Sequence, residues 1–189
     1  TKSENISLIV ADVYPFRLEN LNDLDRKMLG LPVETPEAAE NIDEILEVEG
    51  IDEIHIGLND LHLGYGMTFM FELVADGIVQ KLCEKISKKN ISYGFGGVAR
   101  VGTGTLPAEC ILGEHYRLGS ERVILSRAVC DVAKETDFEV VKEKFKTGVR
   151  DIREFEKKLL NTWNEDTYKA NQQKTKECVA KIVEIIKNK

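Results

Sequence analysis

Two acidic residues, Glu34 and Asp60, have the side-chain type and the spacing for a metal site. Each comes at the end of a short β-rich run, 29–34 or 51–57, and about one strand-and-helix repeat separates them. Parallel strands end at the same edge of a sheet, where α/β enzymes bind substrates and metals, so we expect the two carboxylates to share one mouth. Their oxygens suit Mg²⁺ or Mn²⁺, with water or a bidentate 2-oxo acid completing the shell. Helix caps or surface charges are the alternative from spacing alone.

Two more side chains are candidates for catalysis. His62 lies two residues after Asp60 and could act as an acid or base near neutral pH, or it is an ordinary loop histidine. Arg100 lies in the glycine-rich segment 96–104, whose backbone amides could hold a carboxylate or phosphate. A flexible loop without a ligand is equally consistent with that segment. The two other histidines, in a predicted strand and a predicted helix, are expected to be structural.

The elements that would position these residues alternate along the chain. This alternation is typical of βα units in a parallel sheet, and four units predict half of a (β/α)₈ TIM barrel, with an open doubly wound sheet as the alternative. A further strand at 6–13 and a helix at 18–28 would add one unit at most. The expected strands are 29–34, 51–57, 91–95 and 122–126, and the expected helices are 35–48, 69–88 and 107–118.

The character of the chain changes after Cys130. Two long charged segments, 138–160 and 165–187, carry apolar residues near helical spacing and are predicted to be amphipathic helices. We therefore expect a partial, shortened (β/α) barrel domain at 1–130 and a helical extension at 131–189, which packs on the barrel or on another subunit.

Composition limits the classes of partner. The 189 residues include 26 Lys and Arg against 33 Asp and Glu, a net charge of -7, so no global positive field favours nucleic acid or anionic lipid. No apolar run is long enough for a bilayer, and the first residues lack a signal-peptide pattern. We expect a cytoplasmic protein with a small-molecule or protein partner, no nucleic-acid or membrane partner, and four cysteines that are reduced structural thiols.

Two sequence motifs resemble a known family. The segments VETPEAAENIDEIL at 33–46 and IGLNDL at 56–61 are similar to the central signature of the HpcH/HpaI aldolase and citrate lyase family. The similarity continues less specifically through GFGG at 94–97, LPAE at 106–109 and LSR at 125–127. It covers roughly residues 29 to 130, the C-terminal half of that family's barrel.

The resemblance implies both a site and an activity. It implies that Glu34 and Asp60 bind a divalent metal, Mg²⁺ or Mn²⁺. It also implies that amides in the Asn59-Asp60 turn hold the substrate carboxylate, with Gly57 permitting close approach. The metal would act as a Lewis acid on a pyruvate-type enolate. The expected function is a class II, metal-dependent carbon-carbon lyase or aldolase acting on a 2-oxo acid or a related acyl thioester.

The chain also departs from the family pattern. Leu58 replaces the proline common in the family's turn, and only 33 residues precede Glu34, where the family has four βα units. Those units supply a substrate-binding arginine and a catalytic histidine; we find no match for either, and no role is transferred to Arg17 or His62. The alternative function is a non-catalytic barrel remnant or assembly protein. Because half a barrel leaves two open sheet edges, we expect a homo-oligomer.

Overall fold

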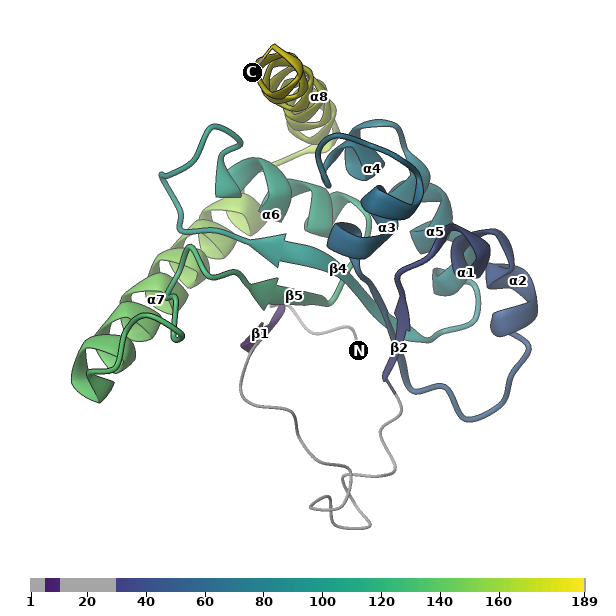
Figure 1. Cartoon of the computed structure of the whole chain (residues 1–189), viewed down its shortest axis with the longest axis horizontal. Helices are drawn as coiled ribbons and strands as arrows, with labels where there is room; N and C mark the ends of the chain where they lie inside the picture. The colour runs from purple at the N-terminus through teal and green to yellow at the C-terminus, as the bar shows by residue number, and fades with distance from the viewer. Residues whose placement is uncertain (1–5, 11–29, 189) are drawn as a thin grey trace.

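A five-stranded parallel sheet forms the centre of the protein (Figure 1). The computed structural model describes residues 6–10 and 30–188. Strands β2 to β5 lie side by side in chain order, and β1 pairs with the far side of β5. The strands are β1 (Ser7–Val10), β2 (Gly30–Val33), β3 (Glu53–Ile56), β4 (Ser92–Val98) and β5 (Arg122–Leu125).

Helices connect these strands and continue beyond the last of them. Parallel neighbours require such crossovers, because a tight hairpin can join only antiparallel strands. The helices are α1 (Pro36–Glu40), α2 (Ile42–Ile45), α3 (Leu58–Gly64), α4 (Glu72–Ala75), α5 (Ile78–Ser87), α6 (Ala108–Arg117), α7 (Phe138–Thr162) and α8 (Glu165–Lys187). The predicted α/β class, with parallel βα repeats and a helical C-terminal extension, is confirmed. The derivation from a (β/α)₈ barrel stays a prediction.

The two faces of the sheet have different surroundings. Ile54 and Ile56 of β3 are fully buried and pack with Phe95 of β4 in a core shared with the helices. Glu53 and His55, which alternate with them, are only half-buried. Since alternate residues of a strand point to opposite faces, the sheet has one helix-covered apolar face and one face with polar side chains.

Two expected helices are interrupted in the structure. The expected helix at 35–48 is divided at Asn41, which ends α1 and begins α2. The expected helix at 69–88 begins only at Glu72 and is divided at Gly77, whose φ of 81° places it in the left-handed region that glycine tolerates. The expected helix at 18–28 lies outside the described residues.

The turn expected at Asn59-Asp60 is part of a helix in the structure. Leu58 is the first residue of α3, so the segment that follows β3 is the first turn of a helix. Leu58 is buried at 1 % exposure, and this burial explains why an apolar residue occupies the turn. The segment that bears Asn59 and Asp60 is therefore fixed to the hydrophobic core through the Leu58 side chain.

The two long C-terminal helices begin where the sequence predicts. The side chain of Asp137 accepts hydrogen bonds from the amides of Glu139 and Val140 at the start of α7, and Asn164 caps α8 in the same way. Within the described residues, neither these helices nor the shorter ones have the length and apolar character needed to cross a bilayer.

Each long helix is held by buried polar contacts, α7 to the residue before β1 and α8 to helix α6. On α7, Glu156 accepts a hydrogen bond from the amide of Ile6 at 3.0 Å, and Arg153 donates to the Ile6 carbonyl at 2.8 Å. On α8, the amide of Asn171 donates to the buried Glu114 of α6 at 3.0 Å. The extension is therefore packed on the α/β part of the same chain.

Candidate functional site

The side chain of Glu34 lies directly against the backbone of Gly57. These residues follow β2 and β3, and the Gly57 amide donates to the Val33 carbonyl at 3.0 Å, so the ladder between the strands continues to this point. A Cβ atom at position 57 would lie 2.5 Å from Oε1 of Glu34 and 2.9 Å from its Cδ. Only glycine leaves room for the carboxylate in this position.

Asp60 belongs to α3, the next helix along the chain. Gly57 is the N-cap of this helix and Asp60 is the acidic residue of its first turn, with an exposed side chain. Side chains of a helix lean toward its N-terminus, which here is the end where Glu34 lies. An acidic residue is also stabilised there by the unpaired amides of the first turn. The fold thus places both predicted metal ligands at the carboxyl edge of the sheet.

A cavity of about 520 Å³ opens at the same edge, between α3 and the segment after β5. Its polar lining comes from Asn59, Ser126 and Arg127, and its apolar lining includes Met70 and Phe145. The segment after β5 is held in place because the Ser126 amide donates to the Val98 carbonyl at 3.0 Å and the Val129 amide donates to the Ser126 carbonyl at 2.9 Å. The remaining lining residues are Ile124, Leu125, Ala128, Cys130 and Val132.

Arg127 and Ser126 were not predicted as site residues. They directly follow β5, just as Glu34 follows β2, so their position at the end of a parallel strand is the signal that could have identified them. An arginine there suits a carboxylate ligand, because its guanidinium can donate two parallel hydrogen bonds. The structure thus adds a cationic residue to the lining of this cavity, which Glu34 and Asp60 do not line.

The two candidate catalytic residues lie apart from this cavity lining. His62 is buried at 8 % exposure, and its Nδ1 lies 3.1 Å from the Leu58 carbonyl, to which it donates. Arg100 is exposed in the loop after β4, where its carbonyl accepts hydrogen bonds from the amide and hydroxyl of Thr103. Neither side chain lines the cavity of about 520 Å³. Their catalytic roles stay predictions.

The polar face of the sheet carries a charged pair below the predicted site. Arg122 of β5 reaches Glu53 of β3 across β4, with Nε and Oε2 2.7 Å apart. The reach is possible because the intervening residue of β4 is Gly94, whose added Cβ would lie 2.7 Å from Cβ of Arg122. His55 lies on the same face, and burial lowers its pKa, an effect opposed by a hydrogen bond to the backbone of Gly96.

The predicted metal ligands are two carboxylates, Glu34 and Asp60. Within residues 6–10 and 30–188, no three His, Cys, Asp or Glu side chains gather as a metal-binding group. Glu34 and Asp60 nevertheless fit Mg²⁺ or Mn²⁺, because these ions are commonly held by one or two carboxylates while water and substrate fill the other positions. A structural zinc site, which needs four protein ligands, does not fit this pair.

Comparisons with known proteins do not assign a family. No family model matches the chain. No curated protein matches it either. Among solved structures, the chain is similar to the HpcH/HpaI aldolase from Desulfitobacterium hafniense DCB-2, with a TM-score of 0.45 and 21% identity, over 69% of this chain and 44% of that one. The chain thus spans less than half the length of that aldolase, and a likeness this low leaves the family a prediction.

Proposed function

We propose that the protein binds Mg²⁺ or Mn²⁺ through Glu34 and Asp60 and acts on a 2-oxo acid as a carbon-carbon lyase or aldolase. One observation carries the proposal: the Glu34 side chain packs on Gly57, the N-cap of the helix that bears Asn59 and Asp60. The resemblance of segments 33–46 and 56–61 to the aldolase and lyase signature supports the same assignment.

The residues around the two carboxylates would bind and orient the substrate. The first-turn amides of α3 have no partners within the helix and suit a substrate carboxylate, as does the Asn59 side chain. Arg127 on the opposite wall offers a second position for a carboxylate. The bound cation would supply Lewis-acid stabilisation of the negative charge on an enolate oxygen.

The volume of the cavity limits the size of the second reactant that could bind there. Its volume of about 520 Å³ lies within the range of small-molecule sites, and Met70 and Phe145 give it an apolar wall. A short aldehyde beside a three- or four-carbon oxo acid would fit this space. An acyl thioester is the alternative substrate, with its long carrier group extending from the open mouth.

Calorimetric titration with Mn²⁺, with and without pyruvate or oxaloacetate, tests the proposed site. We expect Mn²⁺ to bind more tightly with the oxo acid present, and Glu34→Gln and Asp60→Asn each to weaken binding by about tenfold or more. The exposed Glu37, in the first turn of α1, provides the matched control, since Glu37→Gln removes the same charge three residues from Glu34. Equal affinities in all four proteins would disprove this metal site.

A non-catalytic assembly role is the second candidate, and the sheet itself favours it. The five described strands leave β1 and β2 as its edges, and its polar face carries the Glu53–Arg122 pair. Sheet edges with unpaired amides and carbonyls favour pairing with another chain. Metal binding without any turnover of oxo acids would favour this role.

A further inference from the structure

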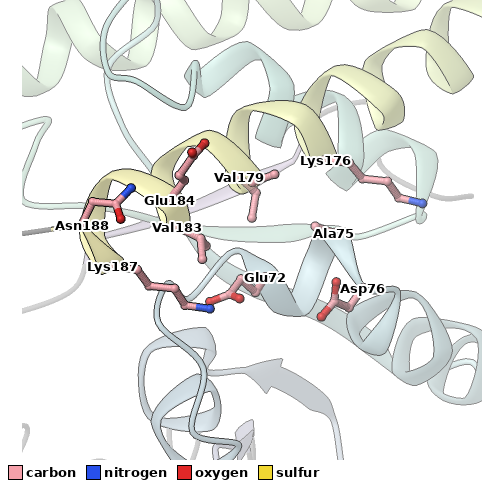
Figure 2. Close-up of a pocket in the computed structure, with 10 residues that line it drawn as sticks. Glu72, Ala75, Asp76, Lys176, Val179, Val183, Glu184, Lys187 and Asn188 are labelled. Carbon is pink, nitrogen blue, oxygen red and sulfur yellow. The ribbon is translucent and has the colours of Figure 1, made fainter.

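A second hollow lies between α4 and the C-terminal half of α8. It has a volume of about 610 Å³ and an apolar floor that includes Ala75, Val179 and Val183. Figure 2 shows Val179 and Val183 pointing from α8 toward α4, with charged side chains around them. The lining is completed by Glu72, Asp76, Lys176, Ala180, Glu184, Lys187 and Asn188. We call this surface the α4–α8 groove.

The rim of the α4–α8 groove carries both signs of charge. The acidic side chains are Glu72, Asp76 and Glu184, and the basic ones are Lys176 and Lys187. A strongly acidic or strongly basic partner would meet like charges at several of these positions, which is costly at an interface. The rim therefore suits a partner surface that itself alternates in sign.

Helix α8 has such a surface, because a lysine and a glutamate lie at equal distances on either side of Ala180. Lys176 and Glu184 lie four residues before and after Ala180, about 6 Å along the helix in each direction. All three residues line the groove and are exposed. A small residue at the centre lets two helices approach closely, with opposite charges at equal distances on either side.

We propose that the α4–α8 groove is the docking surface for a second copy of this chain. The two α8 helices pack antiparallel about a two-fold axis at Ala180, so that Lys176 of each copy meets Glu184 of the other. Each contact then occurs twice, as a two-fold interface requires. The partner's α8 covers the apolar floor at Val179 and Val183. This proposal is independent of the metal site and of any enzymatic activity.

Charge reversal tests the proposal in the full-length chain. Sedimentation equilibrium should give a monomer–dimer equilibrium for the wild type. Lys176→Glu places two like-charged pairs in the dimer, as does Glu184→Lys, and each should raise the dissociation constant by about tenfold or more. The double variant K176E/E184K restores opposite charges in both pairs and should dimerise nearly as well as the wild type.

A control variant on α8 tests whether the rise in the dissociation constant comes from the change in net charge alone. Lys174 is exposed on α8 but does not line the groove, so Lys174→Glu makes the same charge change and should leave the dissociation constant unchanged. Circular dichroism of every variant checks that it is folded. A wild type that stays monomeric at all concentrations would overturn the proposal, as would a dimer that both single reversals leave intact or that the double variant fails to recover.

Discussion

Glu34 occupies the space that a Cβ atom on Gly57 would need. The added atom would lie 2.5 Å from Oε1 of Glu34, well inside van der Waals contact. The conformation of Gly57 is ordinary, with φ of −80° and ψ of 91°, so the requirement for glycine is one of space and not of backbone angle. The end of β2 and the start of α3 are therefore coupled through this one close contact.

Gly57→Ala tests this coupling. The added methyl group should displace the Glu34 carboxylate and weaken Mn²⁺ binding by about tenfold, with a loss of about 1–3 kcal/mol in unfolding free energy from overpacking. Calorimetric titration and urea unfolding measure the two effects. Gly97→Ala is the control, since its Cβ would lie 3.3 Å from the Ile124 carbonyl and does not approach Glu34. Unchanged Mn²⁺ affinity in Gly57→Ala would show that the Glu34 position is unimportant.

Arg127→Gln should weaken the binding of pyruvate, and it should therefore reduce the gain in Mn²⁺ affinity that pyruvate gives. The guanidinium lines the cavity, and a hydrogen bond to a charged group contributes about 1.5–3 kcal/mol, so pyruvate should bind roughly 10- to 100-fold more weakly. Mn²⁺ affinity without pyruvate should be unchanged, because Arg127 is not a ligand. Arg150→Gln, at an exposed position on α7 and outside the cavity lining, is the matched control. Equal pyruvate affinity in wild type and Arg127→Gln would remove Arg127 from the site.

His115 should make the stability of the protein depend on pH. Its ring is fully buried and stacks on Phe95 with ring centroids 3.8 Å apart. Burial, together with the charge of His55, lowers its pKa from 6.5 to about 3. Below pH 6.5 the unfolded chain takes up a proton that the folded protein excludes, so stability is complete above this pH and declines as pH falls toward 3.

The expected loss from His115 at pH 5 is about 2 kcal/mol relative to neutral pH. Urea unfolding at pH 5 and pH 7 measures it against His115→Gln, which removes the titrating ring. The wild type should lose more stability than the variant between these two values. Equal losses in the two proteins would mean that His115 titrates alike in the folded and unfolded states.

Glu156→Ala should loosen the first described strand. The Glu156 carboxylate is fully buried and accepts hydrogen bonds from the Ile6 amide and the Tyr116 hydroxyl, at 3.0 and 3.1 Å. Without it the buried amide of Ile6 loses its hydrogen-bond acceptor, which costs about 1–3 kcal/mol. Hydrogen exchange should accelerate in β1 more than in β3. Glu154→Ala, an exposed neighbour on the same helix, should leave exchange unchanged.

Part of this fold could be predicted because the pattern that specifies it is local. The β-rich run before Glu34 and the acidic first turn at Asp60 are visible as short segments, and the long helix Glu165–Lys187 has the predicted bounds. The pairing of β1 with β5 was not predicted, since it joins segments more than a hundred residues apart. Arg127 was missed as a site residue although its position after β5 could have identified it, and its place beside Asn59 in one cavity lining is visible only in the folded protein.

The breaks within predicted helices have a different cause. Asn41 and Gly77 lie inside apolar patterns that continue on both sides of them, so periodicity alone predicts one helix where the chain forms two. At Gly77 the left-handed backbone lets α5 start in a new direction, and its Val79, Leu82 and Ile86 then reach the core. Tertiary packing thus decides these boundaries.

Exchange of the methyl protons of pyruvate in D₂O, followed by proton NMR, is the most direct test of the proposed function. Formation of an enolate exchanges these protons whether or not an aldehyde partner is known. We expect the wild type with Mg²⁺ to accelerate the loss of the methyl signal, and we expect Glu34→Gln, Asp60→Asn and removal of Mg²⁺ each to abolish the acceleration. A folded wild-type protein that binds Mg²⁺ and pyruvate but gives only the uncatalysed exchange rate would contradict the lyase or aldolase assignment.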